Sequence, residues 1–82
     1  MDPVEENYIW FRNHLNELVK NYNDQYVIIQ DNQVIDSFYS FSYAHNNAIV
    51  DRKLDPGTFI IQFCSLDESK VSEHIFTPNV FV

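Results

Sequence analysis

Cys64 is the single cysteine of the sequence and its best candidate nucleophile. A catalytic thiol needs a base and an electropositive pocket that lower its pKa. His45 and His74 are candidate bases, but no spacing links either of them to Cys64. The thiol ends the apolar, β-branched run from Thr58 to Cys64, and free cysteines in such runs are commonly small buried side chains. The sequence therefore favours a structural role for Cys64.

Three aspartates, Asp24, Asp31 and Asp36, gather around one predicted hairpin. A carboxylate pair could perform acid–base catalysis if its surroundings separated the two pKa values. Aspartates at turns and strand edges are more often solvated turn formers. Asp36-Ser37 approaches the Asp-Thr/Ser-Gly signature of retroviral-type aspartic proteases, but Phe38 stands where that signature has glycine. We therefore predict no catalytic residue and a protein that is not an enzyme.

Few residues are available for a metal or a cofactor. One cysteine and three histidines cannot form a Cys₄ or Cys₂His₂ zinc site within one chain. The single glycine, Gly57, excludes every Gly-rich phosphate-binding loop. His14 follows Trp10 by four residues, a spacing that predicts a stacked pair on a helix surface rather than a ligand site. We expect no metal and no cofactor.

The charge balance is strongly acidic, with twelve acids, five bases and a net charge of −7. The bases are dispersed, whereas nucleic-acid binding usually needs a clustered basic face, so we expect no direct contact with nucleic acid. The acidity is first of all a solubility feature. The alternative is an acidic decoy or inhibitor that occupies the basic site of a nucleic-acid-binding enzyme.

No segment is expected to cross or enter a membrane. The longest apolar runs are three or four residues, far short of a membrane span. The acidic start of the chain, residues 1–6, lacks the basic and apolar regions of a signal peptide. These observations, with the single cysteine, predict a cytoplasmic protein.

Two helices are indicated by capping residues and apolar spacing. Asp2 and Pro3 are typical of a helix start, and apolar residues recur every three or four positions from Tyr8 to Tyr22. Ser40 is a candidate N-cap for a second helix over residues 41–53, which Asp55-Pro56-Gly57 would end.

Four strands are predicted, over residues 26–30, 33–38, 58–64 and 72–77, the last one continuing toward Val82. Asp31-Asn32 suits a type I′ hairpin turn, which would pair Ile29 with Val34 and Ile28 with Ile35. The order α-β-β-α-β-β predicts an α+β fold in one domain, residues 1–82, with a four-stranded, mainly antiparallel sheet of order 2-1-3-4.

Both faces of this predicted sheet are apolar at the centre. Ile28 lies on one face of its strand, with Val27 and Ile29 on the other. The third strand likewise places apolar side chains on both faces. A sheet with one wet face should alternate cleanly between apolar and polar residues. Either the two helices cover opposite faces, or one face is covered by another protein.

Aromatic residues are the better indication of function. They make up 16% of the chain, and not all of them can easily be internal in 82 residues. An exposed aromatic patch usually marks an interface. Our candidate partner-binding residues are Tyr39, Tyr43, Phe76 and Phe81. The expected partner is another protein or a second copy of the chain, bound through this patch or through a sheet edge.

Three motifs resemble a family of small bacterial proteins of unknown function. They are the hairpin Tyr26 to Ile35, the helix start Tyr39-Ser40, and the strand motif from Gly57 to Cys64. Asn32 stands where the family usually has glycine. The resemblance implies an α+β fold with a β-β-α-β centre and no catalytic activity. Such proteins sometimes neighbour retroviral-type aspartic proteases, which implies an accessory role.

Overall fold

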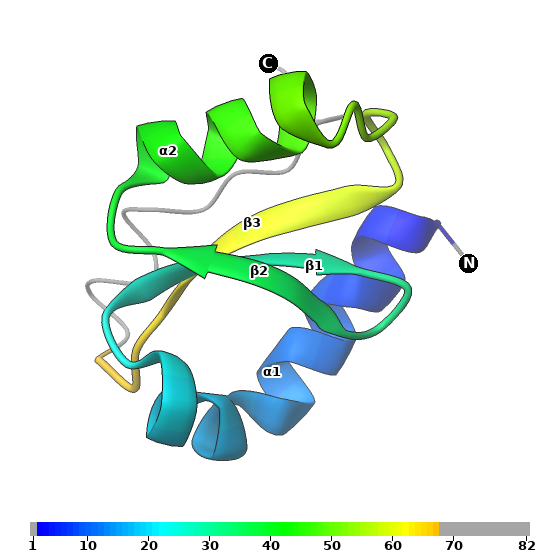
Figure 1. The fold of residues 1–82 in the computed structure, drawn as a ribbon. Helices are drawn as coiled ribbons and strands as arrows, with labels where there is room; N and C mark the ends of the chain where they lie inside the picture. Colours follow the sequence, from blue (N-terminus) through cyan, green and yellow to red (C-terminus); the bar gives the residue numbers. More distant parts are fainter. Residues whose placement is uncertain (1, 68–82) are drawn as a thin grey trace.

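A computed structural model describes residues 2–67 as two helices packed on a three-stranded antiparallel sheet. The strand order is β2-β1-β3. Along the chain the elements are α1 (Pro3–Tyr22), β1 (Gln25–Gln30), β2 (Val34–Phe38), α2 (Phe41–Asn46), the π-helical segment η1 (Asn47–Asp51) and β3 (Phe59–Cys64). Figure 1 shows α1 and α2 on opposite faces of the sheet. The α+β class and the order of these three strands are as predicted, and the predicted fourth strand, residues 72–77, lies outside the described residues.

The first helix begins and ends where its polar residues predict. An Asp2 carboxylate oxygen accepts a hydrogen bond from the Val4 amide at 3.2 Å, and Pro3 occupies the first turn, where its missing N–H costs nothing. The apolar stripe is buried at Phe11 and Leu15. The helix ends before Asp24, whose φ of 61° is incompatible with helical continuation.

The β1–β2 turn has the predicted two-residue geometry. Asp31 and Asn32 have φ values of 55° and 58°, the positive values that a type I′ turn requires. Gln30 and Gln33 close the turn with reciprocal backbone hydrogen bonds of 3.0 and 3.2 Å. Asn32 therefore adopts the conformation for which glycine is more usual.

The predicted hairpin register is correct at Ile29↔Val34 but wrong one step further on. Ile28 pairs with Asp36 and not with Ile35, because a β-bulge interrupts the ladder. In a bulge, two residues of one strand lie opposite a single residue of the neighbouring strand, and the side chains that follow change direction. Ile35 packs in the core under α2, and the shifted Asp36 reaches Arg52 at 3.0 Å.

The second helix is shorter than predicted, and its second half is π-helical. Its α-helical part ends at Asn46 and η1 ends at Asp51, two residues before the predicted end. Lys53 has a φ of 53°, so the backbone leaves the helix there. The Leu54 amide then bonds to the Ala48 carbonyl at 2.9 Å, and Leu54 packs against the core under α2.

The third strand follows a tight turn that depends on glycine. Gly57 has a φ of 93°, which other residues adopt only at a cost. The Thr58 amide bonds to the Asp55 carbonyl at 3.1 Å and closes the turn. Residues 59–64 are all buried, which fits a strand covered on both faces.

Two cores share the sheet, one on each face. The α1 core contains Phe11, Val27 and Ile29, and the α2 core contains Ile28, Phe59 and Ile61. Ala44 and Ala48 are fully buried, so α2 and η1 approach the sheet closely. The chain's own helices therefore cover both apolar faces, which decides between the two arrangements that the sequence allowed.

Candidate functional site

Tyr39 and Tyr43 are the most exposed large apolar side chains among residues 2–67. They are 78% and 71% exposed, respectively. Tyr39 directly follows β2, and Tyr43 lies in the first turn of α2. We call this pair the tyrosine surface. Both residues were predicted to bind a partner, and both lie where a partner can reach them.

Local capping places Tyr43 at the surface. Ser40 has an extended backbone and caps α2, with its hydroxyl accepting from the Tyr43 amide at 3.5 Å and its carbonyl accepting from the Ala44 amide at 3.1 Å. Ala44 is fully buried against the sheet. Consecutive helical residues point about 100° apart, so the side chain that precedes Ala44 turns outward.

A side-chain hydrogen bond holds the Tyr39 ring. Its hydroxyl accepts from Gln25 Nε2 at 3.3 Å, across from the start of β1. Tyr39 therefore stands over the end of the β1–β2 hairpin. An anchored ring loses less conformational entropy on binding than a free one.

Other aromatic residues of the same region are internal, which separates them from the tyrosine surface. Tyr26 lies 4.9 Å from Phe63 and 5.8 Å from Phe41, measured between ring centroids; Tyr26 and Phe63 are buried in the α2 core, and the half-buried Phe41 packs against it. Burial raises the pKa of the Tyr26 hydroxyl. Phe76 and Phe81, the other two predicted partner-binding residues, lie outside the described residues.

The candidate nucleophile is buried, as predicted. Cys64 is fully inaccessible and belongs to the α1 core. Burial, with a smaller contribution from the Asp24 charge, raises the pKa of its thiol to about 11. A catalytic thiol requires the opposite shift.

The aspartates of the hairpin have structural roles. Asp31 forms the turn, and Asp24 adopts a positive φ of 61° just before β1. Asp36, which was expected to be a solvated turn former, instead forms an ion pair with Arg52 and accepts from the Ser37 amide at 2.8 Å. Within residues 2–67 no group of three or more His, Cys, Asp or Glu side chains could hold a metal ion. In that same part of the chain, no helix is both long and apolar enough to cross a membrane.

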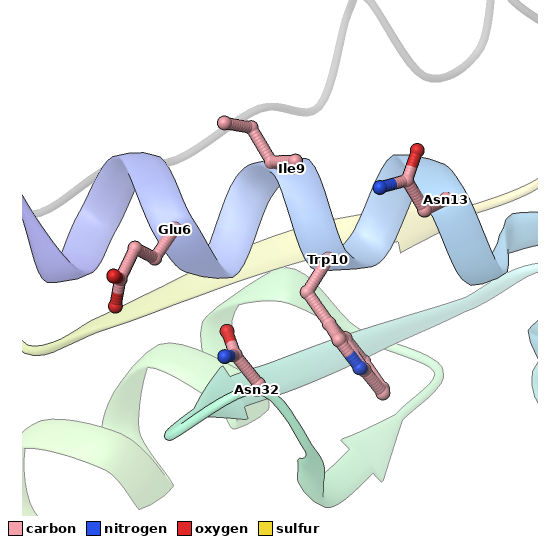
Figure 2. Close-up of a pocket in the computed structure, with 5 residues that line it drawn as sticks. All are labelled: Glu6, Ile9, Trp10, Asn13 and Asn32. Carbon is pink, nitrogen blue, oxygen red and sulfur yellow. The ribbon is translucent and has the colours of Figure 1, made fainter. Parts of the chain in front are cut away.

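A hollow of about 270 Å³ lies between α1 and the β1–β2 turn and was not foreseen from the sequence. We call it the α1–turn hollow (Figure 2). Its lining residues are Glu6, Ile9, Trp10, Asn13 and Asn32. Glu6, Trp10 and Asn13 have the i, i+4, i+7 spacing of neighbouring positions on a helix, so the sequence alone could have predicted that these three residues lie close together. The approach of Asn32 is a tertiary contact that no local spacing indicates.

Trp10 and His14 form the predicted stacked pair. Their ring centroids are 4.5 Å apart, with an interplanar angle of 24°. His14 Nδ1 also lies 2.8 Å from the Trp10 carbonyl oxygen, where it donates a hydrogen bond. The imidazole thus holds the indole from the C-terminal side.

Comparisons of the chain with protein-family models, with curated proteins and with solved structures found no match. The resemblance to small bacterial proteins therefore stays a prediction from the three motifs.

Proposed function

We propose that this chain is a cytoplasmic, non-enzymatic interaction module that binds another protein, or a second copy of itself, through the tyrosine surface. The observation that carries this proposal is the exposure of Tyr39 and Tyr43, 78% and 71%, whereas every other aromatic side chain of residues 2–67 is buried in one of the two cores or packs against it. Tyrosine is enriched among the residues that dominate binding energy at interfaces.

The rigidity of the supporting elements favours binding. Ser40 caps the helix that carries Tyr43, and Gln25 bonds to the hydroxyl of Tyr39. A preorganised surface binds more tightly, because less side-chain and loop entropy is lost on association. Each exposed ring also combines an apolar face with a hydroxyl, so it can be solvated in the free protein and still bury apolar area in a complex.

The position of the tyrosine surface also favours an extended partner segment. Tyr39 continues directly from β2, which has β1 on one side only within the described sheet. An added strand from a partner could pair with β2 and place its side chains beside Tyr39. In this arrangement the aromatic patch and the sheet edge form one binding surface.

The test compares the wild-type chain with a Tyr39→Ser/Tyr43→Ser double variant. Tagged proteins are used to capture partners from lysate of the source organism, and sedimentation velocity measures self-association. We expect a stoichiometric partner, or a dimer, that survives a high-salt wash and disappears in the double variant. Because both side chains are exposed, thermal stability should change little.

Ile9→Ser is the matched control, since Ile9 is an exposed apolar residue, 42% exposed, on the helix that covers the opposite face. It should leave binding intact. Equal binding by the wild type and the double variant would refute the proposal. A partner that washes off in high salt and ignores the tyrosines would instead support the acidic-decoy alternative.

A further inference from the structure

The α1–turn hollow has a fixed frame. Asn7, one residue after Glu6 on α1, is 2% exposed. Its side chain donates to the Thr58 carbonyl at 3.2 Å and accepts from the Asn32 amide at 3.0 Å. These two bonds tie α1 to the β1–β2 turn and to the approach to β3. The distance between Glu6 on the helix and Asn32 on the turn is therefore set by the two hydrogen bonds of the buried Asn7 side chain.

Three lining side chains converge from two elements. Figure 2 shows Glu6 and Trp10 extending from α1 toward the turn, while the Asn32 amide reaches up between them. Ile9 and Asn13 extend from α1 away from the turn. No hydrogen bond or ion pair engages the side-chain oxygens of Glu6 or Asn32 within residues 2–67.

The Trp10 indole is half-buried against the α1 core and lines the hollow with the rest of its surface. His14, four residues later, stacks on the indole from the next turn of α1. Glu6, four residues earlier, lies one turn toward the N-terminus. The hollow is lined by Glu6 and not by His14, so it lies on the Glu6 side of Trp10.

The chemistry of the lining selects a cation. Glu6 is the single charged residue that lines the hollow, and the chain as a whole carries a net charge of −7. An indole face attracts cations through its quadrupole, most strongly for tryptophan. A guanidinium suits this combination better than an ammonium, because its plane stacks on an aromatic ring while its fork of N–H donors matches a carboxylate.

We propose that the α1–turn hollow binds a guanidinium group, which stacks on Trp10, pairs with the Glu6 carboxylate and donates to the Asn32 side-chain oxygen. The group is either part of free arginine or an arginine side chain of a peptide. This site lies on the α1 face, away from the tyrosine surface, and does not depend on the function proposed above.

The single tryptophan of the chain supplies a direct probe. Trp10 fluorescence and the indole N–H resonance are followed while L-arginine or N-acetyl-arginine amide is added. L-Citrulline, which has the shape of arginine with a neutral urea group, is the ligand control. Both arginine compounds should produce saturable changes, with citrulline binding at least about tenfold more weakly, since hydrogen bonds to charged groups are stronger than neutral ones.

Two variants test the assigned contacts. Glu6→Gln retains the shape of the side chain and should weaken arginine binding about tenfold or more. Glu17→Gln removes the same charge from an exposed position of α1 outside the hollow and should leave the affinity unchanged. Asn32→Gly should weaken binding while retaining the turn, because Asp-Gly is a preferred type I′ pair.

The outcomes separate the two sources of the guanidinium. Tighter binding of L-arginine than of its blocked form indicates a free ligand, and equal or weaker binding of L-arginine indicates a peptide side chain. Indistinguishable titrations with arginine and citrulline would overturn the proposal. So would a folded Glu6→Gln variant with wild-type affinity, or the lack of any saturable change in the Trp10 signals.

Discussion

At the scale of single residues, Gln62 is the least expected feature of the core. It is fully buried in β3, opposite Val27, and neither its Nε2 nor its Oε1 has a hydrogen-bond partner within the described residues. By strand alternation its side chain lies on the α1 side, with Ile60 and Cys64. A buried amide without partners lowers stability because its lost hydration is not replaced.

We predict that Gln62→Met stabilises the protein by about 1–3 kcal/mol, the usual cost of an unsatisfied buried polar group. Methionine has a similar length and adapts to irregular gaps in a core. Urea unfolding followed by circular dichroism measures the change. Gln30→Met is the control, because Gln30 Nε2 donates to Thr58 Oγ1 at 3.2 Å and its replacement removes a bond. A less stable Gln62→Met variant would show that the amide is hydrogen-bonded in solution.

A second prediction at this scale concerns the Cys64 thiol. Its pKa is raised from the ordinary value of 9.0 to about 11, mainly by burial. At pH 7 the native thiol should therefore react with iodoacetamide far more slowly than the thiol of the unfolded chain. Rapid alkylation of the folded protein at neutral pH would contradict the structural role of Cys64 and reopen the enzyme alternative.

The same shift gives a stability profile. The unfolded thiol loses its proton near pH 9.0 and the folded thiol near pH 11, so the contribution of Cys64 is complete below pH 9.0 and is lost as the pH rises through that interval. The unfolding free energy of the wild type should therefore decrease between pH 9.0 and about 11, and Cys64→Ala should lack this decrease. An unchanged slope in the variant would assign the fall to other groups.

At the scale of elements, the bulge in β2 links the hairpin to η1. Arg52 Nη2 bonds to Asp36 Oδ2 at 3.0 Å and to the Ile35 carbonyl at 3.4 Å, and its Nε bonds to Asn47 Oδ1 at 2.8 Å. The guanidinium therefore joins the bulged strand to the end of the helix. The Asp36 and Arg52 side chains are 34% and 40% exposed, which limits the strength of the ion pair.

A double-mutant cycle with Asp36→Asn and Arg52→Gln should give a coupling of about 0.2–1 kcal/mol, the range of exposed ion pairs. Each variant removes one charge of the pair, so the cycle isolates the interaction between the two side chains. Thermal unfolding at low and high salt measures the coupling, which should decrease as screening increases. Strictly additive effects would show that the bulge is held by backbone geometry alone.

At the scale of the whole molecule, one sheet serves two cores. Ile60 and Ile61 are adjacent in β3 and both are fully buried, yet Ile60 belongs to the α1 core and Ile61 to the α2 core. Each helix can bury its apolar face only on a sheet that the other helix also stabilises. We therefore expect the two layers to unfold together.

Ile60→Ala and Ile61→Ala should each lower the unfolding free energy by about 2–5 kcal/mol, the usual cost of such a truncation. Trp10 on α1 reports one layer by fluorescence, and far-UV circular dichroism reports both. The two signals should give one midpoint in each variant. An Ile61→Ala variant whose Trp10 transition stayed at the wild-type midpoint would mean that the layers unfold independently.

The local features of this chain could be predicted from its sequence. The cap at Asp2, the turn at Asp31-Asn32 and the cap at Ser40 depend on one or two residues and their backbone angles, and the structure confirms all three. The exposure of Tyr39 and Tyr43 was also foreseen. Consecutive apolar residues in the strands further indicated that both sheet faces are covered, because successive side chains of a strand point to opposite faces.

Features that depend on distant contacts were decided only by the tertiary structure. The bulge at Ile35 moves Asp36 to Arg52, an ion pair between segments that no local pattern connects. The chain's own helices cover both faces of the sheet because α1 packs on one face and α2 on the other, an arrangement that no local pattern indicates. The α1–turn hollow exists because Asn7 bonds to the turn that carries Asn32. Helix and turn propensities act over a few residues, whereas each of these contacts depends on the position of the whole backbone.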